Sequence, residues 1–208
     1  MRSTPKVNLW LAALAFLIST LSAFARDTTT TLRISQDRVA YELIGEFNNT
    51  GINSQQYGYL SSVAGLSSTF NSTTTLDEST ALFTFVTNAT TVQTVIHGPF
   101  KIVDRIGTTT IYLNNGPSDF SDPATFSQGT PIQVSNYTQQ VILNTNTNTF
   151  VTVHTNSITS VTTFTLNGVN YRLGDLCKSF RTNYSGAVNT PGATPNGWFA
   201  GTSIGMRD

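Results

Sequence analysis

Charged residues, cysteine and histidine are all scarce in this sequence. Only 11% of the 208 residues are charged, and the chain has one cysteine and two histidines. A single cysteine, Cys177, excludes an intramolecular disulfide, so packing has to stabilise the fold. Eleven basic residues balance eleven acidic ones, which leaves no basic excess of the kind that binds nucleic acid or anionic lipid. We therefore expect no nucleic-acid partner.

The sequence also lacks an apolar run long enough to span a membrane. The longest run, residues 9–21, has about a dozen apolar residues, whereas a bilayer requires roughly 20. Arg2 and Lys6 precede this run and an AFA motif follows it at 23–25, which is the pattern of a cleavable signal peptide. The sequence thus predicts a signal peptide over 1–25 and a secreted or periplasmic protein. An uncleaved anchor is the alternative.

Helical periodicity is missing as well, because no later segment repeats apolar residues at the spacing of an amphipathic helix. The abundant residues are instead 36 Thr, 20 Ser and 18 Asn, together more than a third of the chain. Threonine is β-branched and suits a half-exposed pleated surface. Aromatic residues alternate with these polar ones through the middle of the chain, which argues against a disordered, mucin-like stalk. This composition is typical of an exported all-β protein.

The clearest strand pair is the hairpin predicted for residues 163–173. Asn167 and Gly168 favour a two-residue type I′ turn, since this turn requires positive φ at both positions. The predicted cross-strand pairs are Leu166–Val169, Phe164–Tyr171, Thr162–Leu173, Thr163–Arg172 and Thr165–Asn170. Turn chemistry and side-chain alternation agree on this register.

Period-two alternation predicts further strands separated by Gly, Pro, Asn and Asp turns. These strands are expected at 38–47, 56–66, 82–87, 91–97, 100–104, 109–113, 132–134, 140–143 and 150–154. The segment 82–87 is apolar on both faces, so it needs cover on its outer side as well. We expect a single antiparallel β-barrel of about eight strands, calycin-like in architecture, with a β-sandwich as the alternative.

The predicted barrel domain covers residues 26–182. Residues 26–31 are expected to be a loose lead-in. Residues 183–208 contain five glycines and two prolines and show no alternation. The sequence therefore predicts a Gly/Pro-rich C-terminal tail, with Trp198 as an anchor that holds it against the barrel.

The two histidines are the first candidates for chemistry, because imidazole titrates near neutral pH and is a common general base. His97 and His154 each fall near the end of a predicted strand, on its more polar side. We interpret both as ordinary side chains that face solvent or a polar lumen. Two distant histidines and one cysteine offer no spaced ligand set, so we expect no metal and no cofactor.

Other candidate reactive groups are weak. Asp119 and Asp122 could bind a cation, but Asp beside Pro and Ser is ordinary turn chemistry. Cys177 is expected to be a small buried side chain. The GTSIG sequence at 201–205 matches the letters of a nucleophile elbow but lacks a following helix and histidine.

Carboxylates and sequons add little more. Glu42 and Glu46 share a strand face and Asp104 lies on another strand, so paired carboxylates for glycoside chemistry stay open. Five N-x-S/T sequons begin at Asn48, Asn71, Asn88, Asn136 and Asn183, which is the number that chance predicts for this composition.

The segments SQQYGYLSSVAGL, ALFTFVT and HGPFKIVDRIGTTTIYL resemble the allene oxide cyclase and dirigent group of small eight-stranded barrels. In that group a Gly-rich early strand leads to an aromatic F-x-F strand and then to meander strands. The resemblance covers residues 38–175 and carries over no catalytic residue. It implies a barrel with an apolar cavity for hydrophobic small molecules, often in a dimer or trimer.

Three functions follow as hypotheses. The first is a non-enzymatic protein that binds a small apolar molecule in a lumen lined by Tyr57, Tyr59, Phe83 and Phe85, although such rings simply fill the core in most small barrels. The second is a surface or matrix component that interacts through its threonine-rich exterior. The third is a cyclase- or isomerase-like enzyme, in which replacement of His97 or Asp104 would matter. The sequence favours the non-enzymatic hypotheses.

Overall fold

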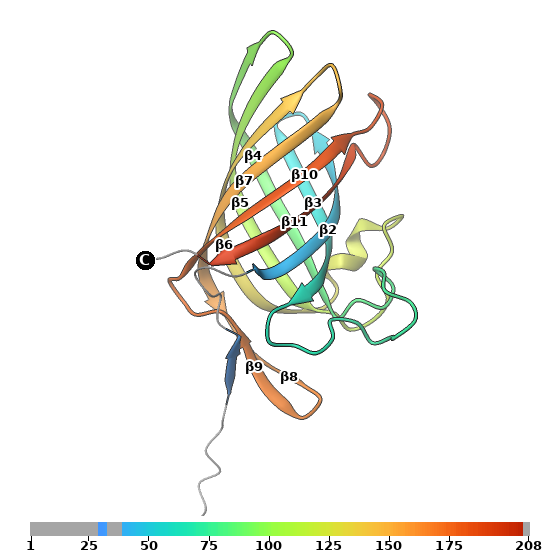
Figure 1. The fold of residues 1–208 in the computed structure, drawn as a ribbon, viewed down its shortest axis with the longest axis vertical. Helices are drawn as coiled ribbons and strands as arrows, with labels where there is room; N and C mark the ends of the chain where they lie inside the picture. The colour runs from blue at the N-terminus through green and yellow to red at the C-terminus, as the bar shows by residue number, and fades with distance from the viewer. Residues whose placement is uncertain (1–28, 33–38, 206–208) are drawn as a thin grey trace, which may run out of the picture.

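The computed structural model describes residues 29–32 and 39–205, and its main body is a closed antiparallel β-barrel of eight strands (Figure 1). In order around the barrel these are β10 (Ser179–Val188), β11 (Gly197–Gly205), β2 (Val39–Thr50), β3 (Asn53–Val63), β4 (Phe83–His97), β5 (Phe100–Leu113), β6 (Thr130–Asn144) and β7 (Thr149–Val161). The predicted barrel is confirmed and the alternative sandwich is wrong. The predicted signal peptide at 1–25 lies outside the described residues.

The barrel strands are longer than the sequence pattern indicates. Strand β4 joins the segments predicted at 82–87 and 91–97, and β5 and β6 each join two predicted strands in the same way. Strands β4 and β5 stay paired across residues 88–90, between the two predicted segments, and Ala89 lies opposite Gly107. A Cβ on Gly107 would lie 2.1 Å from a backbone oxygen of β4, so glycine here marks a close strand approach and not a turn.

The predicted C-terminal tail is wrong, because residues 183–205 form most of β10 and β11 in the barrel wall. Two of the glycines that suggested a loop, Gly186 and Gly197, face large rings inside the barrel. A Cβ on Gly186 would come within 2.6 Å of the Phe150 ring, and one on Gly197 within 2.7 Å of the Phe47 ring. Glycine therefore makes room for neighbouring aromatics, a role that looks like a turn signal in sequence alone.

A second, three-stranded sheet is formed by β1 (Thr30–Leu32), β9 (Val169–Leu173) and β8 (Thr163–Leu166). The predicted hairpin is confirmed, with φ of 51° at Asn167 and 77° at Gly168, and four of its five predicted pairs form. The exception is Thr162, whose amide donates to the Ile132 carbonyl at 2.9 Å. Strand β1 pairs parallel to β9, so part of the expected loose lead-in is ordered.

This small sheet closes one end of the barrel, below the barrel strands in Figure 1. Phe164 of β8 packs edge-on against Phe83 of β4, with ring centroids 5.6 Å apart. Gln133 donates to the Leu173 carbonyl of β9 at 2.7 Å, and Leu32 of β1 belongs to the same buried cluster. The β4–β5, β6–β7 and β10–β11 hairpins project from the opposite end of the barrel (Figure 1).

A loop that carries η1 (Pro123–Ser127), a 3-10 helix, covers the outer face of β3 and β4. Phe126 is fully buried there against Tyr57 and Val86, and the Thr84 hydroxyl donates to the Phe126 carbonyl at 2.8 Å. This loop supplies the outer cover that the two-sided apolar segment 82–87 was predicted to need. Within the described residues, no helix has the length and apolarity required to cross a bilayer.

Candidate functional site

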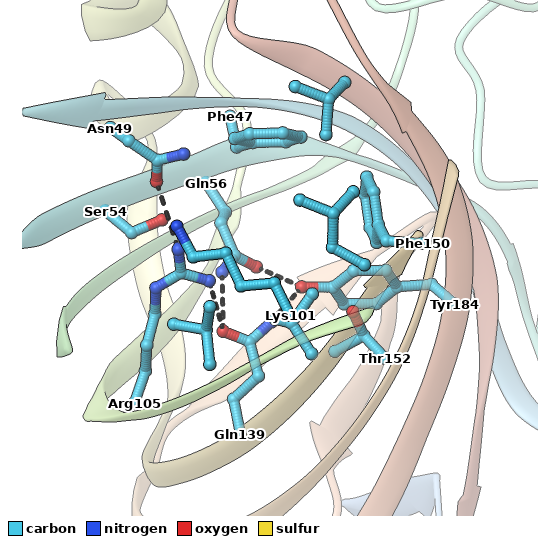
Figure 2. A pocket seen from close by; sticks show the side chains of 14 residues that line it. Phe47, Asn49, Ser54, Gln56, Lys101, Arg105, Gln139, Phe150, Thr152 and Tyr184 are labelled. Carbon is cyan, nitrogen blue, oxygen red and sulfur yellow. Dashed lines mark hydrogen bonds between the residues drawn. The ribbon is translucent and has the colours of Figure 1, made fainter. Parts of the chain in front are cut away.

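A cavity of about 210 Å³ lies inside the barrel at the end opposite the small sheet (Figure 2). Its walls come from β2, β3, β5, β6, β7 and β10. The lining residues are Phe47, Asn49, Ser54, Gln56, Lys101, Val103, Arg105, Gln139, Val141, Leu143, Phe150, Thr152, Tyr184 and Val188. Several of them adjoin the projecting hairpins, so the cavity belongs to the open end of the barrel.

The cavity walls combine aromatic and aliphatic surface with positive charge. Phe47 and Phe150 meet edge-on with centroids 5.6 Å apart, and four Val and Leu side chains extend the apolar wall. Lys101 and Arg105 supply two positive charges, and no Asp or Glu lines the cavity. In the view of Figure 2, both cationic side chains end on the Asn49 side of the cavity, away from Phe150.

Arg105 is held by neutral groups at long distances. Its Nη1 donates to Gln139 Oε1 at 3.4 Å and its Nη2 to Asn49 Oδ1 at 3.5 Å (Figure 2). Its Nε is buried and has no hydrogen-bond partner within the described chain. Hydrogen bonds of this length are weak, so the guanidinium has spare donor capacity.

A hydrogen-bonded belt crosses the lumen beneath the cavity. Gln56 donates to the Tyr137 hydroxyl at 3.0 Å, and the Tyr184 hydroxyl donates to Gln56 Oε1 at 2.8 Å. Gln139 donates to the Tyr184 hydroxyl as well. Burial raises the pKa of both Tyr137 and Tyr184, so both phenols stay neutral donors. Residues from β3, β6 and β10 thus form a polar floor that separates the cavity from the closed end.

His154 lies below this belt, inside the barrel. It is 7% exposed, and its ring lies 4.8 Å from the Tyr137 ring and 5.0 Å from the Tyr184 ring, centroid to centroid. Neither ring nitrogen has a hydrogen-bond partner in the described part of the chain. Burial lowers its pKa to about 3.

The sequence predicted that each histidine faces either solvent or a polar lumen. His154 lies in the lumen, and His97 faces solvent on the β4–β5 hairpin.

The four predicted ligand-binding residues do not come together. Phe83 and Phe85 face the interior as predicted, but they belong to the packed core and neither lines the cavity. Tyr57 and Tyr59 lie on the outer face, where Tyr57 packs 5.5 Å from Phe126 between ring centroids. Their predicted place in the lumen is wrong because Gln56, and not an aromatic residue, is the inward-facing neighbour.

The predicted carboxylates also lie outside the lumen. Glu42 and Glu46 share the outer face of β2, as predicted. Glu46 is buried there and accepts hydrogen bonds from Trp198 Nε1 at 2.9 Å and from the Tyr57 hydroxyl at 3.2 Å. Burial raises the pKa of Glu46, and these two hydrogen bonds oppose part of the increase. Asp104 faces away from the cavity, since its neighbours Val103 and Arg105 line it.

The remaining candidates have structural explanations. Asp119 and Asp122 accept turn hydrogen bonds from the amides of Ser121 and Ala124 at 2.8 and 3.2 Å, which confirms the turn interpretation. Cys177 is exposed, with φ of 63°, so the prediction of a buried side chain is wrong because this residue forms a tight turn. Ser203 of the GTSIG sequence is buried within β11, and no strand-to-helix elbow is present there.

Lys101 and Arg105 are the functional candidates that sequence reasoning missed. Both stand on one face of β5, alternating with Ile102 and Asp104. Alternation does place them on the face shared with Val103. However, charged residues normally lie on the wet exterior, so alternation alone does not single out these two side chains.

Comparison of the chain with protein-family models, curated protein sequences and solved structures finds no match.

Proposed function

We propose that this protein binds a small, mainly apolar molecule in the cavity at the open end of its barrel, without transforming it. The observation that supports this proposal is the cavity itself. The closed end is packed mainly with aromatic and aliphatic side chains, whereas the open end leaves about 210 Å³ between Phe47, Phe150 and the aliphatic walls. Concave sites with mainly apolar walls and a few polar groups are the usual form of a small-molecule site.

The size of the cavity limits the ligand. At roughly 30 Å³ for a water-sized group, the space accommodates about seven such groups. A compact molecule or a short aliphatic chain fits this volume, and a larger ligand would have to extend past the hairpins into solvent.

The polar groups of the cavity favour binding over the cyclase or isomerase reaction that the family resemblance implies. General acid–base chemistry needs a group that changes protonation near the working pH. No His, Asp, Glu or Cys lines the cavity. His154, the imidazole nearest to it, sits beneath the belt of Tyr137 and Tyr184 and lacks a hydrogen-bond partner in the described chain.

Two neighbouring substitutions on β6 test this proposal. Leu143 lines the cavity, while Ile142 faces outward and is 38% exposed. Leu143→Trp should fill the cavity, and Ile142→Trp should add the same side chain outside it. Calorimetric titration with 1-octanol, a neutral probe, should show one site per chain in the parent protein and in Ile142→Trp, and no binding to Leu143→Trp.

Thermal unfolding of both variants provides the control for folding. Mass spectrometry of an organic extract from the purified protein should also detect a stoichiometric small molecule if the site is filled during expression. Octanol binding that is unchanged by Leu143→Trp would contradict the proposal.

A further inference from the structure

We propose that the cavity selects an acidic amphiphile, a molecule with an anionic head group at Lys101 and Arg105 and a short aliphatic chain against the apolar wall. This inference rests on the proposed function and specifies its ligand class. It follows from an uncompensated pair of positive charges in a mainly apolar enclosure.

The two cationic side chains lie on the inward face of one strand and line the cavity. They stand four residues apart on β5, so they point to the same side of the sheet. Both line the cavity, and no carboxylate lines it with them. The enclosure therefore carries a net charge of about +2 that no residue of its wall offsets.

The hydrogen-bonding capacity of the Arg105 guanidinium is poorly satisfied within the described residues. Its two hydrogen bonds, to Gln139 and Asn49, are at 3.4 and 3.5 Å and both acceptors are neutral amides. Its buried Nε donor has no partner within the described residues. A buried donor without a partner costs free energy, and a guanidinium matches an oxyanion with two parallel hydrogen bonds. An anionic head group would supply the charged acceptor that the wall lacks.

The apolar part of the ligand has its own surface. Phe150 lies on the far side of the cavity from the Asn49 and Arg105 groups in the view of Figure 2, and Leu143 and Val188 also line the cavity. The volume holds about seven groups of water size, which is fewer than the non-hydrogen atoms of an eight-carbon amphiphile, so part of an octyl ligand would extend past the hairpins into solvent. Carboxylates and phosphate monoesters share the anionic chemistry, and separate probes distinguish them.

Calorimetric titration of the purified protein at pH 7.5 with four probes of equal chain length tests the inference. The probes are octanoate, octyl phosphate, 1-octanol and octylammonium. We expect octanoate or octyl phosphate to bind at least about tenfold more tightly than octanol, since one charge-assisted hydrogen bond is worth that much. Octylammonium should bind weakest.

Substitutions connect this preference to the two cations. Arg105→Gln should weaken binding of the acidic probe about tenfold or more, and Lys101→Gln should weaken it less. Octanol is titrated into the same variants, and the loss of affinity should be much larger for the acidic probe than for octanol, which carries no charge. Arg181→Gln is the matched control, because Arg181 is exposed on the outer side of β10, and it should leave every affinity unchanged.

The outcomes separate the two proposals. If neither octanoate nor octyl phosphate binds more tightly than octanol, or if Arg105→Gln leaves acid binding intact, the acidic ligand class is overturned and the binding function still stands. Failure of all four probes to bind the parent protein would overturn both. A preference for either acidic probe that Arg105→Gln strongly reduces and Lys101→Gln reduces less supports both.

Discussion

The two ends of the barrel interior differ in packing, although the same alternating strands line both. At the closed end, Phe83, Phe164 and Leu173 fill the lumen, and the β8–β9 hairpin covers it. At the open end, similar apolar residues stand beside Lys101 and Arg105 around an unfilled cavity. The belt that includes Gln56 and Tyr184 divides the two regions. Under the proposed function, the closed end supplies stability and the open end supplies the binding site.

The first prediction is the largest and concerns the contribution of each end to stability. Phe83→Ala removes a ring that is 1% exposed, so the free energy of unfolding should fall by about 3–5 kcal/mol. Leu143→Ala, in a wall that already borders empty space, should cost less than about 2 kcal/mol. Urea denaturation monitored by circular dichroism measures both values. Equal losses of unfolding free energy in the two variants would show that the two ends contribute equally to stability.

The second prediction concerns the sealed imidazole beneath the belt. The pKa of His154 is lowered from 6.5 to about 3 in the folded protein, so the unfolded chain takes up a proton first as pH falls. Stability should therefore be unaffected by this group above pH 6.5, and should fall by about 1.4 kcal/mol per pH unit below it. Between pH 6.5 and 5, the free energy of unfolding should fall by about 2 kcal/mol.

His154→Phe should remove this pH dependence, because the ring site between Tyr137 and Tyr184 is kept while the titrating group is lost. His97→Gln is the control, since His97 is exposed, and it should leave the dependence in place. Urea denaturation of the three proteins at pH 7.5, 6.5 and 5.0 provides the measurement. An unchanged slope in His154→Phe would show that the imidazole is not sealed.

The third prediction concerns the hairpin that closes the barrel. Gly168 has φ of 77°, and an L side chain there costs about 1–2 kcal/mol. Gly168→Ala should lower the free energy of unfolding by about that amount, and Gly168→Asn by less, because asparagine tolerates positive φ. Neither change should alter octanol binding at the opposite end. A loss of binding would show that the two ends are coupled.

The fourth and smallest prediction concerns Arg105 in the absence of ligand. Its hydrogen bonds are long and reach only neutral acceptors, so Arg105→Gln should change the free energy of unfolding by less than about 1 kcal/mol. Chemical denaturation of the ligand-free protein provides the value. A loss above about 3 kcal/mol would assign Arg105 a structural role instead of a binding one.

Local patterns in the sequence predicted the class of fold and one hairpin well. The Asn167-Gly168 turn and its register needed only neighbouring residues, and the alternation of residues such as Phe83 and Phe85 placed them inside. Strands β10 and β11 were missed because Gly186 and Gly197 look like turn residues until the rings of Phe150 and Phe47 are placed beside them.

The candidate site was less predictable, because it depends on which face of each strand closes inward. Tyr57 and Tyr59 were assigned to the lumen as aromatics, yet aromatic residues of the loop that carries η1 pack against both on the outside. Arg105 was overlooked because a charged residue is expected to face water. Only closure of the barrel brings Arg105 within reach of Asn49, which is 56 positions away in the chain.

Methyl-detected NMR during a titration with octanoate locates the ligand and so shows whether it binds in the cavity at the open end. Chemical shift changes are expected to concentrate on the cavity methyl groups of Val103, Val141, Leu143 and Val188, with little change at Leu60 and Ile158 in the packed interior. Changes centred on the outward-facing Ile142 and Val151, with the cavity methyl groups unaffected, would contradict binding in the cavity.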